Sequence, residues 1–129
     1  MTYSIKDPIF GRFYEILIFK DENEMLEFEN KNDLHFGVED RVVDDISGNF
    51  FEKYKYSVIT IPESFLLDFN AKHLAKLAKE CLYCMFDSFE ELQIKLDLEN
   101  QEIPAYYHEW LYVETLNVVF KHQKKLLKK

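Results

Sequence analysis

The stretch FYEILIF, Phe13 to Phe19, decides the fold class of this 129-residue chain. It is a short and nearly continuous apolar run, and such a run fits a buried strand as well as a segment of helix. Asp7 followed by Pro8 could cap and open a first helix just before it. The pattern alone leaves the choice between strand and helix open.

Downstream of this run, the clearest strand signal is FFEKYKYSVITI, Phe50 to Ile61. It is rich in β-branched and aromatic residues, alternates along its length and is ended by Pro62. SGN, Ser47 to Asn49, has the composition of a turn. With only three glycines and three prolines, the chain has few turn signals, which favours long helices over a many-stranded sandwich.

The remaining segments favour helices. ENEMLEFEN and VEDRVVDDI are compatible with helix, and another helix is predicted to begin between Pro62 and Asn70 and to run to about Phe86. The sequence SFEE, from Ser88, is a capping box that predicts a further helix ending near Asn100. Pro104 suits the first turn of a long C-terminal helix.

These segments predict a mainly α fold, a single domain of about four to five helices with a small β element. The alternative is an α+β fold with a small antiparallel sheet formed by residues 12–20 and 50–61. Residues 1–129 are expected to form one domain, with 121–129 as a frayed lysine-rich tail.

The C-terminal helix is predicted to face the core with one apolar stripe. The stripe consists of Tyr106, Trp110, Val113, Leu116, Phe120 and Leu127, with Tyr107, Leu111 and Val118 beside it. His108, Thr115 and His122 are expected on the opposite, exposed face.

Two short motifs bear on metal and redox chemistry. HEWLY, His108 to Tyr112, lacks the second histidine of the zinc motif HExxH, because Tyr112 stands there and is a poor ligand. CLYC holds Cys81 and Cys84 inside a predicted helix, where small buried residues are the expected role. A zinc pair completed by a distant residue such as His35 is the alternative. We expect no metal and no cofactor.

Composition predicts a packed core, since 47% of the residues are hydrophobic and 16% are aromatic. No apolar run reaches the length of a membrane span, and the N-terminus lacks the basic and apolar regions of a signal peptide. A cytoplasmic location and no membrane contact are therefore expected. Without a P-loop, a nucleophile elbow or a catalytic-cysteine signature, the prediction is that the chain is not an enzyme.

Acidic residues dominate the body of the chain. The net charge is −8, but five lysines lie in KHQKKLLKK, so residues 1–120 carry eleven basic against 24 acidic residues. Residues 21–45 hold ten acids against Lys31 and Arg41, and residues 87–102 hold six against Lys95. The ten acids are Asp21, Glu22, Glu24, Glu27, Glu29, Asp33, Glu39, Asp40, Asp44 and Asp45.

Such a charge distribution has two interpretations. The acids can be solvated, solubilising faces of helices, or they can steer a basic partner protein that aromatic residues then hold. Direct binding of nucleic acid is disfavoured, because the body of the chain repels phosphate.

The acidic segments DENEMLEFENKND and VEDRVVDD, together with the aromatic PAYYHEWLYVE, resemble the immunity proteins of bacterial contact-dependent growth-inhibition and colicin-like systems. The resemblance implies a basic toxin domain as partner, often a nuclease, neutralised in a one-to-one complex. On this hypothesis the ten acids steer the partner and Tyr107 anchors it. A structural or adaptor subunit is the first alternative, and an enzyme with an unrecognised carboxylate-based site is the second.

Overall fold

The run FYEILIF forms the strand β2 (Phe13–Phe19) at the centre of a four-stranded sheet. The computed structural model describes residues 1–36 and 41–128, in which the strand order is β1-β2-β4-β3. β1 (Thr2–Lys6) and β3 (Ser47–Phe51) are the edge strands, and β4 (Tyr56–Pro62) lies beside β2. β1–β2 and β3–β4 are antiparallel pairs, whereas β2 and β4 are parallel.

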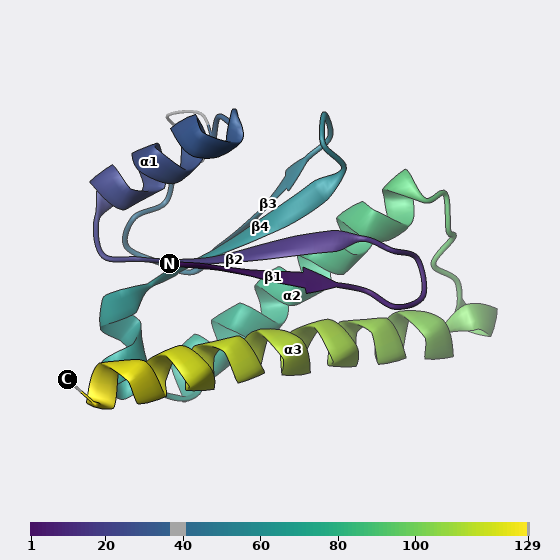
Figure 1. Cartoon of the computed structure of the whole chain (residues 1–129). Coiled ribbons are helices and arrows are strands. Elements are labelled where there is room, and N and C mark those ends of the chain that lie inside the picture. The colour runs from purple at the N-terminus through teal and green to yellow at the C-terminus, as the bar shows by residue number, and fades with distance from the viewer. Residues whose placement is uncertain (37–40, 129) are drawn as a thin grey trace.

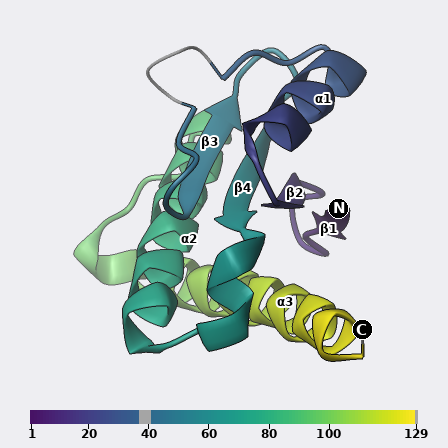
Figure 2. The same ribbon diagram turned by 90° about the vertical axis from the view of Figure 1, so that its left-hand side faces the viewer.

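Helices cover both faces of this sheet. α2 (Ala71–Glu91) and α3 (Glu102–Leu127) lie on one face, and α1 (Glu22–Asn32) lies over part of the other (Figures 1 and 2). Two short 3-10 helices, η1 (Glu63–Asp68) and η2 (Leu98–Asn100), precede α2 and α3. The prediction of a mainly α fold is therefore wrong, and the described residues form an α+β fold with a mixed sheet.

The central position of β2 explains why its sequence was ambiguous. Ile16 and Ile18 pack with the cluster under α2 and α3, while Leu17 and Phe19 pack with Met25 and other residues of the α1 layer. A strand covered on both faces has no polar face, so it loses the alternation that marks a half-exposed strand. The α+β alternative had the right class, but its pairing of 12–20 with 50–61 as antiparallel is wrong.

The segment Phe50 to Ile61 is a hairpin and not one strand. β3 begins at Ser47, inside the predicted turn, and the chain reverses at residues 52–55 before β4. Lys55 has a φ of 55°, and the carbonyl of Phe51 accepts hydrogen bonds from the backbone N–H groups of Tyr54 and Lys55. The aromatic and charged composition of this segment concealed a turn without glycine or proline.

Helix boundaries agree with the sequence in part. α1 contains the predicted ENEMLEFEN helix, and Pro104 lies in the first turn of α3. α2 begins after Asn70, whose side chain caps it, but it continues through Ser88 to Glu91. Ser88 lies inside α2, where its buried hydroxyl bonds to the Tyr14 hydroxyl and does not cap a helix. SFEE therefore does not start a helix. Of the VEDRVVDDI segment, residues 41–46 are not helical, and the earlier part lies outside the described residues.

Asp7 caps a turn, not a helix. It lies between β1 and β2, where its buried carboxylate accepts hydrogen bonds from the backbone N–H groups of Ile9, Phe10 and Arg12. The same carboxylate accepts a hydrogen bond from the hydroxyl of Tyr107 on α3, at 2.8 Å. Asp7 therefore ties the β1–β2 connection to the helical layer.

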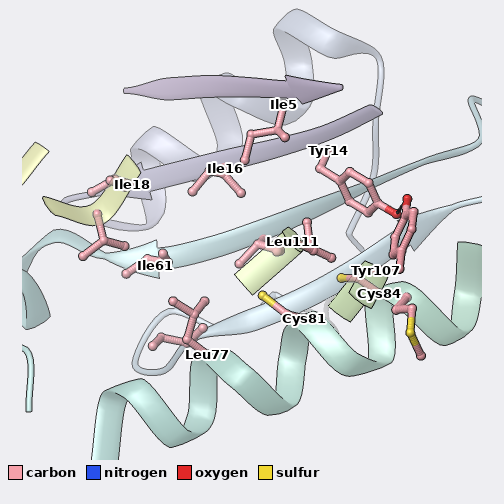
Figure 3. Close-up of a cluster of buried hydrophobic side chains, with 14 of the residues drawn as sticks. Ile5, Tyr14, Ile16, Ile18, Ile61, Leu77, Cys81, Cys84, Tyr107 and Leu111 are labelled. Atoms are coloured by element: carbon pink, nitrogen blue, oxygen red, sulfur yellow. Dashed lines mark hydrogen bonds between the residues drawn. The ribbon is translucent and has the colours of Figure 1, made fainter. Parts of the chain in front are cut away.

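The core between the sheet and the helices contains a chain of hydroxyl groups. Tyr14 of β2 and Tyr107 of α3 point toward each other across it (Figure 3), and their oxygens are 2.5 Å apart. Burial raises the pKa of Tyr14 to about 12, and burial also raises the pKa of Tyr107. Both side chains are neutral at physiological pH, and each finds the hydrogen-bond partners that a buried phenol requires.

Cys81 and Cys84 are buried in α2, as predicted for small core residues (Figure 3). Burial raises the pKa of the Cys81 thiol to about 12 and raises that of Cys84 as well. Cys84 packs against Gly48 of β3, where an added Cβ would lie 2.9 Å from its sulfur. The glycine allows α2 to approach the edge of the sheet closely.

The face of α3 that meets the core differs from the predicted one. Its buried residues are Tyr107, Leu111, Thr115, Val119 and His122. The Thr115 hydroxyl donates to the carbonyl of Leu111, and His122 is hydrogen bonded to Tyr3 and Glu63. His108 is half-buried with its Nε2 atom 2.8 Å from the carbonyl oxygen of Ala78. These polar groups are satisfied inside the fold, so the expectation that they are exposed is wrong.

The lysine-rich segment that begins at Lys121 is helical as far as Leu127, where α3 ends. None of the helices in the described part of the chain has an apolar stretch long enough to cross a membrane.

Candidate functional site

The described structure has two acidic surfaces that could bind a basic group. The first is a groove of about 350 Å³ between α1 and strands β1 and β2, which we call the α1 groove. Among the residues that line it are Ser4, Glu15, Glu24, Glu27 and Lys31. The second is a cavity of about 490 Å³ at the end of α2, which we call the α2-end pocket.

The sequence of α1 accounts for the way it presents its acids. Asp21 caps the helix by accepting a hydrogen bond from the Glu24 backbone N–H at 3.0 Å. Met25 and Phe28 turn inward onto Leu17 and Phe19, which leaves Glu24 and Glu27 along the groove. Acids in the first turn also stabilise the helix through its dipole, so Glu22 and Glu24 have a structural role in addition to any binding role.

Glu29 is the one acid of the described 21–45 run that is buried. Its carboxylate accepts hydrogen bonds from the Arg41 guanidinium at 2.7 and 3.0 Å, and from the backbone N–H of Phe36 at 3.2 Å. The pairing with Glu29 raises the pKa of Arg41. Glu29 therefore holds the segment after α1 in place and does not form part of an open surface.

The other predicted acids do not form one cluster with the α1 groove. Asp33 ends α1 with a φ of 52°, accepts a hydrogen bond from the Tyr54 hydroxyl, and is exposed. Asp44 is exposed and Asp45 is 3.5 Å from the Lys76 ammonium, both beside α2. Glu39 and Asp40 lie outside the described residues. The structure thus brings Glu24 and Glu27 together in the α1 groove but separates them from Asp44 and Asp45.

Tyr107, the predicted aromatic anchor, is buried in the core. Only 3% of its side chain is exposed. The neighbouring Tyr106, which was assigned to the core stripe, is exposed instead. Trp110 is half-buried and packs against Tyr14 and Tyr107.

The α2-end pocket is lined by Phe50, Glu52, Lys55, Asp87, Glu90 and Glu91. Glu91 is paired with Arg12 and with Lys55, whose ammonium is 3.4 Å from it. Within the described residues, Asp87 and Glu90 form no salt bridge. Burial, followed by the charge of Glu90, raises the pKa of Asp87. Asp87 and Glu90 therefore carry negative charge that is not paired within the described residues.

These carboxylates lie where the helix dipole is unfavourable to them. Asp87, Glu90 and Glu91 belong to the last two turns of α2, which has no basic residue in its last turn. The negative end of a helix dipole disfavours anions. The sequence contained this signal as the acidic run from Asp87, but the helix boundary predicted at Ser88 assigned these residues to the start of another helix, where acids are favoured.

Glu15 and Glu52 are the further acids that sequence reasoning missed. Glu15 lies on β2 and accepts a hydrogen bond from Ser4 at 2.6 Å, whereas Glu52 lies in the β3–β4 turn. Neither belongs to an acidic run, so only the sheet register and the hairpin place them beside the acids of the helices. The arrangement of both surfaces suits an ammonium or guanidinium group. Among the described residues, no group of three or more potential ligands is placed to hold a metal ion.

Comparison of the chain with protein-family models, with curated proteins and with solved structures found no match.

Proposed function

We propose that this chain is an inhibitor of the immunity type, which binds and neutralises a basic protein through its acidic surfaces. The observation that carries the proposal is the charge of the α2-end pocket, where the half-buried Asp87 lies close to the exposed Glu90 and neither carboxylate forms a salt bridge among the described residues. Groups that violate the electrostatic preferences of their own helix are often kept for function. A lysine or arginine side chain of a partner would relieve this repulsion.

The acids of the α1 groove are proposed to steer the partner and not to hold it. Glu24 and Glu27 add to the negative field that steers a basic protein toward the complex, along with Asp21, Glu22, Asp33, Asp44 and Asp45 on nearby surfaces. Such steering raises the rate of association and is screened by salt. We therefore expect association with the partner to slow steeply as ionic strength rises.

The test begins with affinity capture from the native host at low and moderate salt, with the bound chains identified by mass spectrometry. The expected result is a basic polypeptide, encoded beside this chain, that is held in a one-to-one complex. Expression of that polypeptide should stop growth only when this protein is missing. Recovery of the protein alone, or growth arrest that this protein does not relieve, would contradict the proposal.

A matched pair of variants then assigns the surface. Asp87→Asn with Glu90→Gln should weaken capture at least tenfold and abolish protection, because the pocket loses its free charge. The same variant should unfold at higher urea concentration than the wild type, since it removes a like-charge repulsion. Glu99→Gln with Glu102→Gln removes two exposed acids elsewhere and should leave capture and protection intact. Equal loss in both variants would show that only net charge matters.

A further inference from the structure

The outward side of α3 carries an apolar stripe of which the described structure covers only Trp110 in part. Tyr106, Val113, Phe120 and Leu127 recur every seven residues and are 68, 46, 46 and 72% exposed. Ile103, 47% exposed, precedes these four residues, and the half-buried Trp110 lies between Tyr106 and Val113. Both continue the alternating three- and four-residue spacing of a coiled coil. We call these six residues the outer stripe.

The same spacing continues through two polar positions, Asn117 and Lys124, so the repeat runs from Ile103 to Leu127. A seven-residue repeat keeps its stripe facing a partner helix when two helices wrap around each other. Polar residues at single positions of such a seam fix its register and cost stability. The outer stripe therefore has the form of one half of a two-helix interface.

The charges along α3 specify how a second copy would pair with it. The acids Glu102, Glu109 and Glu114 lie in the first half of the helix, and its lysines, Lys121, Lys124 and Lys125, all lie in the second half. Two copies side by side in the same direction would place acid against acid and lysine against lysine. In the opposite direction, each acidic half meets a basic half.

We propose that two copies of this chain associate through their outer stripes, with the α3 helices antiparallel about a two-fold axis between Val113 and Asn117. This register places Leu127 of one copy level with Ile103 of the other, and Lys124 level with Tyr106. It also places the half of each helix that holds Glu102 and Glu109 alongside the half of the other helix that holds the lysines. The partner of this surface is thus a second copy of the same protein.

A cavity at the start of α3 fits the end of the second helix. It has a volume of about 280 Å³ and is lined by apolar residues that include Pro8, Ile9, Ile103, Tyr106 and Trp110. In the antiparallel register, Leu127 of the other copy lies at this cavity. Six side chains from each copy, burying roughly 100 Å² each, would bury about 1,200 Å² summed over both copies. This is the lower end of the area of a specific interface. We therefore expect a dissociation constant in the micromolar range.

The dimer is independent of the proposed inhibitor function, because the outer stripe contains none of the acids assigned to the α1 groove or the α2-end pocket.

The first test measures the mass of the full chain by sedimentation equilibrium between roughly 1 and 200 μM. The mass should rise from monomer to dimer across this range, and Val113→Lys or Phe120→Glu should weaken dimerisation at least tenfold. Leu67→Glu changes an apolar residue of η1 that is 69% exposed and lies outside the stripe, and it should have no effect. A chain that stays monomeric, or a dimer that both stripe variants leave unchanged, would overturn the proposal.

The second test measures the direction of the helices with introduced cysteines, since Cys81 and Cys84 are buried. Mild oxidation of a mixture of Ile103→Cys and Leu127→Cys should link the two variants by a disulfide, whereas Leu127→Cys alone should not be linked. The converse result would show parallel helices and overturn the antiparallel arrangement.

Discussion

The two sides of α3 show opposite relations between residue type and burial. The side that meets the sheet holds Thr115 and His122 among its buried residues, and each of these polar groups has a hydrogen-bond partner. The outward side holds Tyr106, Phe120 and Leu127, which are exposed. The more regular apolar spacing therefore lies on the outward side of α3, which does not face the sheet.

This difference teaches that a hydrophobic stripe identifies a surface to be covered but does not say what covers it. A polar residue can enter the core at small cost when its partners are already in place. Tyr3, from the other end of the chain, supplies one such partner for His122, and Glu63 supplies another. The stripe that remains outside is then free to meet another molecule.

The largest expected effect contrasts Leu111 with Val113. Leu111 is fully buried, so Leu111→Ala should lower the free energy of unfolding by about 3 kcal/mol through lost contacts and a cavity. Val113→Ala should cost about 0.5 kcal/mol or less when the protein is monomeric. Urea unfolding at low micromolar concentration measures both. Equal costs would show that the outward side is packed within the monomer.

A smaller effect contrasts two adjacent tyrosines by removal of one hydroxyl group from each. Tyr107→Phe takes away the donor to Asp7 and a partner of Tyr14, so it should cost about 1–2 kcal/mol. Tyr106→Phe alters an exposed side chain and should change stability by less than about 0.5 kcal/mol. The same unfolding assay compares them. A neutral Tyr107→Phe would mean that the buried hydroxyl chain contributes no net stability.

The smallest effect is the loss of stability at alkaline pH. An unfolded tyrosine ionises near pH 10, whereas the pKa of Tyr14 in the fold is about 12, so the unfolded chain releases its proton first. Stability contributed by the neutral phenol is complete below about pH 10 and is lost as pH rises toward 12. At pH 11 the loss should be roughly 1 kcal/mol.

Urea unfolding at pH 9 and pH 11 checks this slope. Tyr14→Phe should reduce the loss between the two pH values, since phenylalanine does not titrate. Tyr106→Phe, on the outward side, should leave the loss unchanged. If Tyr14→Phe had the full slope of the wild type, ionisation of other groups would account for it.

The sequence predicted correctly those features that depend on the residues of one segment alone. The helix in ENEMLEFEN, the start of α3 near Pro104 and the burial of Cys81 and Cys84 are of this kind. It failed at Ser88, whose capping-box pattern lies inside α2, because the side chain bonds to Tyr14 from another element. It also failed at residues 52–55, where the turn uses none of the usual turn residues.

The candidate site divides in the same way. The acidity of the run from Asp21 and the cap formed by Asp21 itself follow from the sequence. The burial of Glu29 depends on Arg41, and the α2-end pocket depends on a hairpin and a helix end that meet only in the fold. Charge is a property of composition, whereas the environment of each carboxylate is a property of packing.

By itself, the sequence determined that this protein is acidic, has a packed apolar core and contains a long C-terminal helix with a regular apolar repeat. The tertiary structure alone decided that FYEILIF is the central strand, that β2 and β4 are parallel, and which side of α3 faces the sheet. The physical reason is that periodicity reports how residues are arranged around one element. Burial depends on the other elements that arrive from elsewhere in the chain.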